Sequence, residues 1–299
     1  MMAFAPIALF VYNRPWHTRQ TVEALTRNQQ AGDSDLFVFS DAGKNASDTG
    51  PVGEVRGYIR EIGGFKSVTI VERTGNYGLS RAVISGVSEV LADSDTVIVV
   101  EDDLVTSPYF LNFMNAALAM YRDDPRVISI HGYVYPVGDV LPETFFLKGA
   151  DCWGWGTWKR GWDLFDRDGR HLLDQLKARK LTDRFDFHGA YPFTLMLRDQ
   201  ISGKTDSWAV RWYASALLND MFTLYPGRPL VQNIGTDNSG TNCGKTSRYQ
   251  VEIASEPIAL ARRATLEEES VVQFFERFFR SCRPSLYRRL LGRLGLGGR

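Results

Sequence analysis

The chain has 299 residues, of which 44% are hydrophobic and 12% aromatic, which excludes a disordered protein and leaves room for a large α/β core. Its 35 basic and 35 acidic residues give a formal net charge of zero, so no overall field attracts nucleic acid. The three cysteines Cys152, Cys243 and Cys282 are widely spaced, which favours a reducing compartment. We therefore expect a cytoplasmic protein without a nucleic-acid partner.

Short apolar runs alternate with amphipathic stretches in the first third of the chain. The first run, residues 5–12, lacks the basic start and cleavage site of a signal peptide and is expected to be a strand. Strands that are continuously apolar are covered on both faces, so the pattern predicts a parallel sheet with helices on either side. The expected strands are residues 5–12, 35–40, 67–72 and 95–100, and the expected helices are about 15–29, 50–63 and 79–92.

The second half of the chain is less regular and richer in aromatic residues. Residues 152–166 hold four tryptophans, and residues 236–249 read as a polar loop that contains glycine. Residues 266–292 have a helical pattern with four phenylalanines on one side. Further helices are expected at about 170–180, 190–201 and 207–220, and a turn with a short strand at 225–235.

Polar side chains follow four of the expected strands at the points where those strands end. In open parallel sheets, ligands bind in the crevice outside the carboxyl ends of the strands. The convergence of polar groups from four strands therefore predicts one ligand-binding crevice. The groups are residues 13–14, Asp41, residues 73–76 and residues 101–103.

Three adjacent acids, Glu101, Asp102 and Asp103, directly follow a run of β-branched apolar residues. Neighbouring carboxylates repel one another, and their desolvation is unfavourable. A hard divalent cation such as Mn²⁺ or Mg²⁺ would balance them, since it takes oxygen ligands and shares its remaining positions with water and substrate phosphates. The alternative is a solvated loop in which the acids have no special role.

Four short sequence motifs and a later series of three carry a resemblance to a known family. The chain resembles nucleotide-sugar glycosyltransferases of the GT-A fold, with N-acetylglucosaminyltransferase I as the nearest eukaryotic likeness, and bacterial polysaccharide-type sugar transferases. The resemblance covers about residues 5–245. The motifs are "YNRP", "FSDAG", "NYGLSRA", "VIVVEDDL" and the later series "GADCWGWGTWKRGWDLFD", "DSWAVRWYASALL" and "LYPGRPLVQNIGTDNSGT".

The resemblance implies a GT-A (Rossmann-like), mostly parallel central sheet flanked by helices, with a helical, aromatic-rich acceptor-side half. We expect a single domain at residues 1–265, with the donor-binding half at about 1–135 and the acceptor-side half at about 136–265. A basic amphipathic helix and tail at residues 266–299 would follow this domain.

The resemblance also implies roles for the residues at the strand ends. Asp103 corresponds to the metal ligand, and Glu101 and Asp102 correspond to the positions that touch the ribose and the donor sugar. Arg14 corresponds to the basic residue that contacts the nucleotide, and Asp41 to the acid that accepts the uracil N–H. From the residues alone, the alternative for Arg14 is a surface charge at a helix start, and the alternative for Asp41 is a role limited to shaping a turn.

Arg81 lies on the first turn of the helix expected at residues 79–92. At that position it could neutralise a phosphate bound near the helix N-terminus. An exposed surface arginine is the alternative.

Asp206 is the candidate catalytic base, because an inverting transfer needs a carboxylate to take the acceptor proton. The alternative role for Asp206 is an N-cap of the helix that follows. In the eukaryotic relative two adjacent acids precede the tryptophan, and the second is the base, whereas this chain has Ser207 there. Asp151 is therefore the next candidate. A second departure is Asn242, where bacterial relatives tend to have histidine.

Trp155, between two glycines, is the tryptophan expected to contact the acceptor, since aromatic faces suit the apolar side of a sugar ring. The other tryptophans of this segment are expected in the core, because their spacing is that of a buried helix. His131 follows a strand, where a lone histidine is usually structural.

Together these observations predict a metal-dependent enzyme, expected to act with inversion, that moves a sugar from a UDP-sugar to a glycan or lipid-linked acceptor in surface polysaccharide synthesis. One alternative is a sugar-phosphate nucleotidyltransferase, although "YNRPW" replaces the glycine-rich basic loop of those enzymes. Another is a catalytically degenerate GT-A fold that binds without turnover. The GxGxxG motif of nicotinamide dehydrogenases is absent after the first strand.

The arginine-rich end of the chain suggests a contact with a membrane. Phenylalanines on one side of a helix, surrounded by arginines, suit the surface of an anionic membrane. The expected location is therefore the cytoplasm, with peripheral contact at the inner face of the membrane. A solvated helix with a frayed tail is the alternative.

Overall fold

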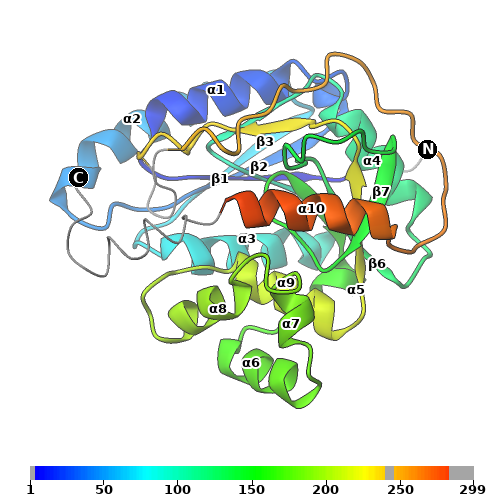
Figure 1. The fold of residues 1–299 in the computed structure, drawn as a ribbon. Helices are drawn as coiled ribbons and strands as arrows, with labels where there is room; N and C mark the ends of the chain where they lie inside the picture. The colour runs from blue at the N-terminus through cyan, green and yellow to red at the C-terminus, as the bar shows by residue number, and fades with distance from the viewer. Residues whose placement is uncertain (1–3, 240–245, 283–299) are drawn as a thin grey trace.

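An eight-stranded sheet forms the centre of the protein (Figure 1). The computed structural model describes residues 4–239 and 246–282. The strand order is β3-β2-β1-β4-β8-β6-β9-β7, and β10 and β5 pair in a separate two-stranded sheet. The strands are β1 Ile7–Val11, β2 Asp35–Ser40, β3 Ser67–Glu72, β4 Thr96–Glu101, β5 Leu104–Thr106, β6 Val127–His131, β7 Thr144–Lys148, β8 Trp155–Trp158, β9 Phe222–Pro226 and β10 Val231–Asn233.

Most of the central sheet is parallel. Strands β3, β2, β1 and β4 pair in parallel, and so do β6 and β9. Strand β8 runs antiparallel to both of its neighbours, β4 and β6, and β7 runs antiparallel to β9. A mostly parallel α/β sheet with helices on both faces is the architecture expected from the sequence, and that fold class is confirmed.

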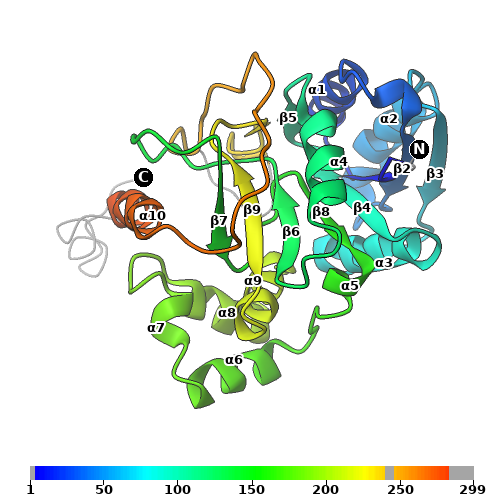
Figure 2. The same cartoon turned by 90° about the vertical axis from the view of Figure 1, so that its right-hand side faces the viewer.

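Helices cover both faces of the parallel part of the sheet. Figures 1 and 2 place α1 and α2 on one side of β1 and β2, and α3 on the other. Figure 2 also shows α6, α7 and α8 grouped at one end of the molecule. The helices are α1 Pro15–Thr26, α2 Thr49–Ile59, α3 Gly78–Asp93, α4 Phe110–Met120, α5 Lys159–Trp162, α6 Gly169–Ala178, α7 Thr182–Phe185, α8 Phe193–Ile201, α9 Ala209–Leu218 and α10 Glu269–Ser281.

Strand β1 is apolar throughout because its side chains point alternately to the two faces of the sheet, and both faces are covered. Ile7 and Leu9 pack into the cluster formed with α1, α2 and α4. Ala8 and Phe10 point to the opposite face and pack with α3. Because successive side chains of a strand point to opposite faces, a sheet covered on both sides needs apolar residues at every position.

The aromatic side of α10 packs against the protein itself. Phe275, Phe278 and Phe279 are buried and contact a second core around β7, β9 and α9, where Phe275 meets Phe145 and Tyr225. The expectation that this face lies free for a membrane is therefore wrong for α10. Residues 283–299 lie outside the described residues. Within the described part of the chain, no helix combines the length and the apolar character that crossing a membrane requires.

The tryptophan-rich segment, residues 152–166, contains a strand where the spacing of its tryptophans predicted a helix. Trp155–Trp158 is strand β8, which lies between β4 and β6, and only the short helix α5 follows it. Trp155 is completely buried and its ring packs against the rings of Trp162, Trp208 and Trp212. In this structure Trp155 is therefore a core residue without a face for an acceptor.

Replacing Trp155 with alanine is expected to lower the free energy of unfolding by about 3–5 kcal/mol, because the change leaves a large cavity among packed rings. Chemical denaturation measures this loss. The matched control is Trp16→Ala, since Trp16 is 59% exposed and its removal should change stability by less than about 0.5 kcal/mol. Equal stability of the two variants would contradict the burial of Trp155.

Candidate active site

The strand-end residues meet at one edge of the sheet. Strand β1 lies between β2 and β4 and is parallel to both, so the carboxyl ends of all three strands lie side by side. Arg14 follows β1 and is the N-cap residue of α1, Asp41 follows β2, and the acid cluster Glu101, Asp102 and Asp103 follows or ends β4.

Arg14 makes the central contact of this edge. Its Nη2 lies 2.9 Å from Oδ2 of Asp103 and also pairs with Oδ1 of Asp102, while its Nε lies 3.4 Å from Oδ2 of Asp102. Burial opposes the charge on Arg14, but the two adjacent carboxylates outweigh it and raise the pKa of the guanidinium. The side chain of Arg14 therefore remains charged and holds two of the three acids.

Burial and mutual repulsion oppose the ionisation of the acid cluster. Burial raises the pKa of Glu101 to about 8, and Asp103 and Asp102 add to this rise. Burial also raises the pKa of Asp102, against the opposing effect of Arg14. Asp102 and Asp103 thus share one guanidinium, and the raised pKa values show that further negative charge is unfavourable here unless a cation balances it.

The donors of the cluster suit a hard cation that is only partly held by protein. They are carboxylate oxygens, and the side chain of Asp103 is 15% exposed. No set of three or more His, Cys, Asp or Glu side chains in the described residues is arranged to hold a metal ion by itself. The cluster therefore fits a cation such as Mn²⁺ or Mg²⁺ that takes one or two carboxylates and completes its shell with substrate oxygens and water.

A loop after β10 packs directly on the acid cluster. Ile234 N–H donates to the Asp103 carbonyl at 2.8 Å, and a Cβ on Gly235 would lie 2.1 Å from Oδ2 of Asp103. Only glycine allows the backbone to approach the carboxylate this closely. His17 Nε2 lies 3.1 Å from Oδ2 of Asp237 and ties this loop to α1. Asn242 lies outside the described residues.

Sequence reasoning did not single out His17 or Asp237. Asp237 stands in the polar loop that the motif "IGTDNSG" marked, but nothing local links it to a histidine on α1. The contact depends on how β10 pairs with β5, directly behind the acid cluster.

Asp41 orders the turn that leads into α3. Its two oxygens accept hydrogen bonds from the backbone N–H groups of Tyr77 (2.8 and 3.0 Å) and Gly78 (2.9 Å) and from Nδ2 of Asn76 (3.2 Å). It also accepts from its neighbour Ala42 N–H at 2.9 Å. The turn-shaping role that the sequence left open is therefore present, and contact with uracil stays a prediction.

Arg81 projects from the first turn of α3 and stacks on an aromatic ring. Its guanidinium carbon lies 3.8 Å from the centre of the Tyr77 ring. This arrangement is a cation–π contact. Contact between Arg81 and a phosphate stays a prediction.

Asp206 caps a helix other than its own. Its Oδ2 accepts a hydrogen bond of 3.1 Å from the backbone N–H of Ser80, in the first turn of α3. Among the described residues, α9 has no side-chain cap at its N-cap residue Trp208. The carboxylate of Asp206 is thus held by α3 and not by α9, which follows it in sequence.

Arg211 is a second residue of this region that sequence reasoning missed. It is buried, and it donates to the Ser80 hydroxyl, to the Arg167 carbonyl at 2.8 Å and to the Ser207 carbonyl at 3.3 Å. Burial lowers the pKa of Arg211, and Asp206 opposes this shift. An arginine within an amphipathic helix is typical of a surface, so the sequence held no sign of its burial.

Glu101 and Asp206 belong to the same face of the sheet. Val97 and Val99 pack with α3 and with Trp208 at the start of α9. Side chains two positions apart on a strand share a face, so Glu101 continues the row of Val97 and Val99. Asp102 instead contacts Arg14, on the side of α1.

His131 lies buried beside Asp151, the second candidate base. His131 Nε2 is 3.7 Å from Oδ2 of Asp151, and neither ring nitrogen has a hydrogen-bond partner within the described part of the chain. Burial lowers the pKa of His131 to about 4, although Asp151 acts in the opposite direction. The imidazole is therefore neutral near pH 7.

The stability of the protein should fall as the pH decreases from about 6.5 to 4 because of His131. In that pH range His131 of the unfolded chain, whose pKa is the ordinary 6.5, binds a proton. The buried His131 of the folded chain stays neutral, because its pKa is about 4. One such proton changes the free energy of unfolding by about 1.4 kcal/mol per pH unit. We expect His131→Leu to remove this slope, and urea denaturation at several pH values measures it. An unchanged slope, equal to that of the exposed control His188→Ala, would contradict the assignment.

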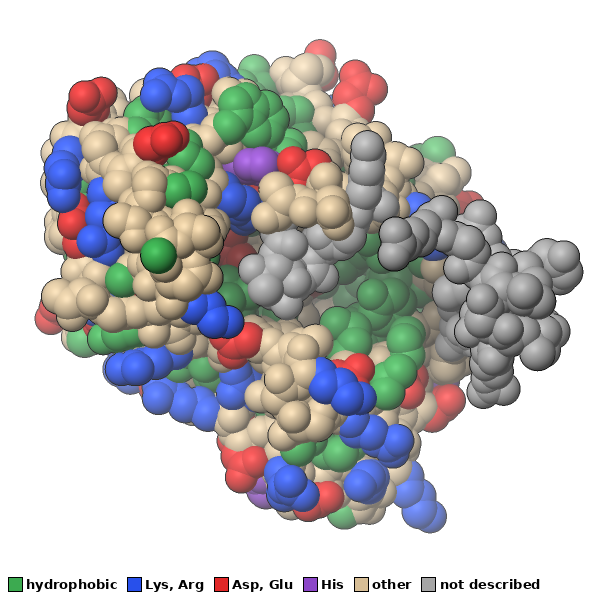
Figure 3. Space-filling model, turned by 90° about the vertical axis from the view of Figure 1, so that its left-hand side faces the viewer, with side chains coloured by type: hydrophobic (Ala, Val, Ile, Leu, Met, Phe, Trp, Pro, Cys, Tyr) green, Lys and Arg blue, Asp and Glu red, His purple; other side chains and the backbone are tan. Residues whose placement is uncertain are grey.

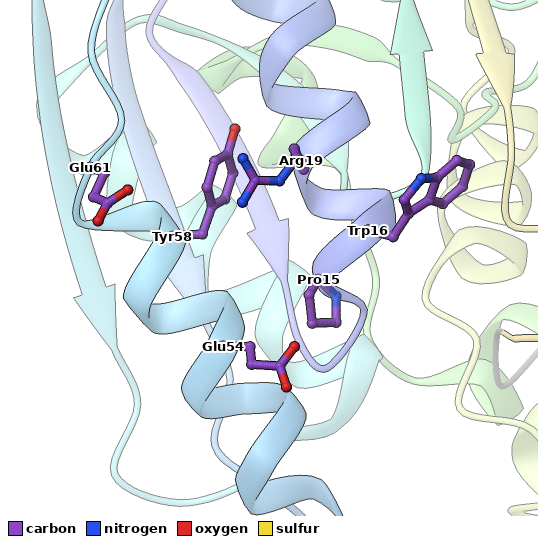
Figure 4. Close-up of a pocket in the computed structure, with 6 residues that line it drawn as sticks. All are labelled: Pro15, Trp16, Arg19, Glu54, Tyr58 and Glu61. Carbon is purple, nitrogen blue, oxygen red and sulfur yellow. The ribbon is translucent and has the colours of Figure 1, made fainter.

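A shallow groove between α1 and α2 lies beside the site (Figure 4). The Arg19 guanidinium carbon lies 4.4 Å from the centre of the Tyr58 ring in this groove. Figure 3 shows that one face of the molecule is hollowed, with side chains of both charges around the hollow. The groove between α1 and α2 is lined by Pro15, Trp16, Arg19, Glu54, Tyr58 and Glu61.

No protein-family model and no curated protein matches the sequence. Among solved structures, the mannosyltransferase PcManGT from Pyrobaculum calidifontis with GDP-Man and Mn²⁺ is 15% identical, with a TM-score of 0.32 over 45% of this chain and 36% of that chain. TarS of S. aureus is 13% identical, with a TM-score of 0.37 over 75% of this chain and 36% of that one.

A UDP-glucose pyrophosphorylase complexed with UDP-glucose is 10% identical, with a TM-score of 0.35 over 75% of this chain and 90% of that chain. This chain thus spans about a third of the length of PcManGT and of TarS. The TM-scores of these three structures mark weak likenesses in overall fold.

Proposed function

We propose that this protein is a metal-dependent glycosyltransferase that moves a sugar from a UDP-sugar, with inversion, to a glycan or lipid-linked acceptor in surface polysaccharide synthesis. The observation that supports this proposal is the acid cluster, in which Asp102 and Asp103 share the single guanidinium of Arg14 and burial raises the pKa of the adjacent Glu101 to about 8. The cluster lies at the carboxyl edge of a parallel sheet, where such folds bind their ligands.

A cation is needed because a diphosphate is itself anionic. The carboxylates of Asp102 and Asp103, which share one guanidinium, would repel it at close range unless a cation balanced their charge. Asp103, whose carboxylate is partly exposed, would hold Mn²⁺ or Mg²⁺ together with the phosphate oxygens. When bound, such a cation stabilises the negative charge of the departing UDP.

The remaining donor contacts are proposed from the family resemblance. Arg14 lies against Asp102 and Asp103, so its guanidinium is available to a phosphate that approaches the same carboxylates. Glu101 and Asp102 would contact the ribose and the donor sugar. Asp41 and Arg81 would contact the uracil and a phosphate, respectively. In this proposal residues 1–135 bind the donor, and residues 136–265 bind the acceptor.

Asp206 would act as the general base. The acceptor hydroxyl gives its proton to the carboxylate of Asp206 as its oxygen bonds to the anomeric carbon, and the bond from that carbon to the diphosphate breaks. Asp206 is preferred to Asp151 because it lies at the start of α9, on the sheet face that carries Glu101. Inversion follows when one displacement occurs on the face opposite the leaving group.

A screen of nucleotide sugars with Mn²⁺ tests this function. We expect release of UDP from one UDP-sugar, with the sugar passed to water or to an added acceptor. Release of pyrophosphate from a sugar phosphate and UTP would instead establish the nucleotidyltransferase alternative. Tight UDP binding without turnover of any donor would establish the degenerate binding module.

We further propose a cytoplasmic location with peripheral contact to anionic lipid through residues 283–299, which contain Arg283, Arg288, Arg289, Arg293 and Arg299. The aromatic face of α10 is covered and does not contribute. Co-sedimentation should occur with vesicles that contain phosphatidylserine and not with neutral vesicles. Equal binding to both kinds of vesicle would contradict this contact.

A further inference from the structure

The first turn of α3 touches the candidate base at two points. Ser80 N–H donates to Oδ2 of Asp206 at 3.1 Å. A Cβ on Gly78 would lie 2.9 Å from the same oxygen, closer than a real side chain tolerates. Gly78 also has a φ of +72°, a conformation in which glycine is favoured. The carboxylate of Asp206 therefore rests directly on the backbone of residues 78–80.

Arg211 fixes the same junction from the side of α9. Its buried guanidinium joins the Ser80 hydroxyl to two carbonyl groups, those of Arg167 and Ser207. Ser207 is the residue next to Asp206, so this contact holds the backbone that carries the base. The start of α9 is thereby fastened to the start of α3, although 126 positions separate Ser80 and Asp206.

We infer that Gly78, Ser80 and Arg211 are positioning residues for Asp206. This inference rests on the proposed function, in which Asp206 is the base. Asp206 lies in an exposed segment ahead of its helix, where a carboxylate has several rotamers. Its contacts with α3 select one of them. Displacement of a catalytic group by about 1 Å can reduce the rate by about 100-fold.

This arrangement also joins the two halves of the proposed active site. Asp41, from the donor side of the proposed site, accepts hydrogen bonds from the N–H groups of Tyr77 and Gly78, and Gly78 also lies against Asp206. The same few residues of α3 thus hold an acid from each side. The base is aligned by the element that orders the expected nucleotide-binding turn.

The substitution Gly78→Ala tests this role, because the added methyl group displaces the end of the flexible Asp206 side chain while the Gly78 N–H is retained. Gly138→Ala is the matched control. Gly138 has a φ of +79°, and none of the described residues lies within 4 Å of the position that an added methyl group would take, so that variant carries similar backbone strain without the contact. Crystal structures of both variants show the place of Asp206.

We expect Asp206 Oδ2 to leave hydrogen-bond distance of Ser80 N–H in Gly78→Ala. Turnover of UDP-glucose, or of the UDP-sugar that the wild type prefers in the screen, should fall by about 10- to 100-fold, while the Kd for UDP with Mn²⁺ changes by less than about twofold. Gly138→Ala should match the wild type in all three measurements.

Two results would overturn the inference. One is a Gly78→Ala structure in which Asp206 keeps its bond to Ser80 N–H, and the other is equal turnover by Gly78→Ala and Gly138→Ala. Failure of the proposed function is recognised separately, because Asp206→Asn would then turn over the donor as fast as the wild type, whatever the position of the side chain in Gly78→Ala.

Discussion

Replacing Asp103 with asparagine is expected to weaken the binding of UDP in the presence of Mn²⁺ by at least about 100-fold. Loss of a residue that only supports a metal ligand already costs about 10- to 100-fold in metal affinity, and loss of the ligand itself should cost more. Asparagine keeps the shape of the side chain and removes its charge. Isothermal titration calorimetry with UDP, with and without Mn²⁺, measures the effect.

The control for this prediction is Asp123→Asn. Asp123 is 91% exposed, and its substitution removes the same charge at the surface. The control should bind UDP and Mn²⁺ as the wild type does. If Asp103→Asn also did so, the acid cluster would be only a set of ion pairs with Arg14, and the metal-dependent function would be lost with it.

Replacing Asp206 with asparagine is expected to lower the turnover of the donor by about 10²- to 10⁴-fold, because the amide cannot accept the acceptor proton. The amide oxygen can still accept the hydrogen bond from Ser80 N–H, so the side chain should keep its place. The affinity for UDP with Mn²⁺ should therefore be unchanged. Steady-state kinetics with calorimetry separate the two effects.

Asp151→Asn is the variant to compare with Asp206→Asn. Asp151 is the other acid that the sequence offers as a base, and it lies beside the buried His131. We expect Asp151→Asn to keep most of the turnover. The opposite pattern, with Asp151→Asn inactive and Asp206→Asn fully active, would move the role of base to Asp151.

The parallel half of the fold was predictable because its signals are local. Continuous apolar runs mark β1, β2 and β4, and Pro15 begins α1 as expected. Strand β8 was missed, because its tryptophans have the spacing of a buried helix. Its strand form arises from pairing with β4 on one side and β6 on the other, and no local pattern encodes that pairing.

The candidate site was likewise predictable where general rules of the fold apply, and not where contacts between distant segments decide. The rule that parallel strands end at a common edge brought Arg14 to the acid cluster, and the ion pairs of Arg14 with Asp102 and Asp103 have that geometry. The surroundings of Asp206 could not be predicted in this way. Its partner Ser80 is distant in the sequence, and the buried Arg211 looks like an ordinary surface residue of a helix.

A crystal structure of the protein with Mn²⁺ and UDP tests the central claim most directly. We predict that Mn²⁺ lies between the Asp103 carboxylate and the diphosphate, and that Arg14 turns from Asp103 toward a phosphate oxygen. A structure in which Asp102 and Asp103 remain paired only with Arg14, while UDP binds elsewhere or not at all, would contradict it.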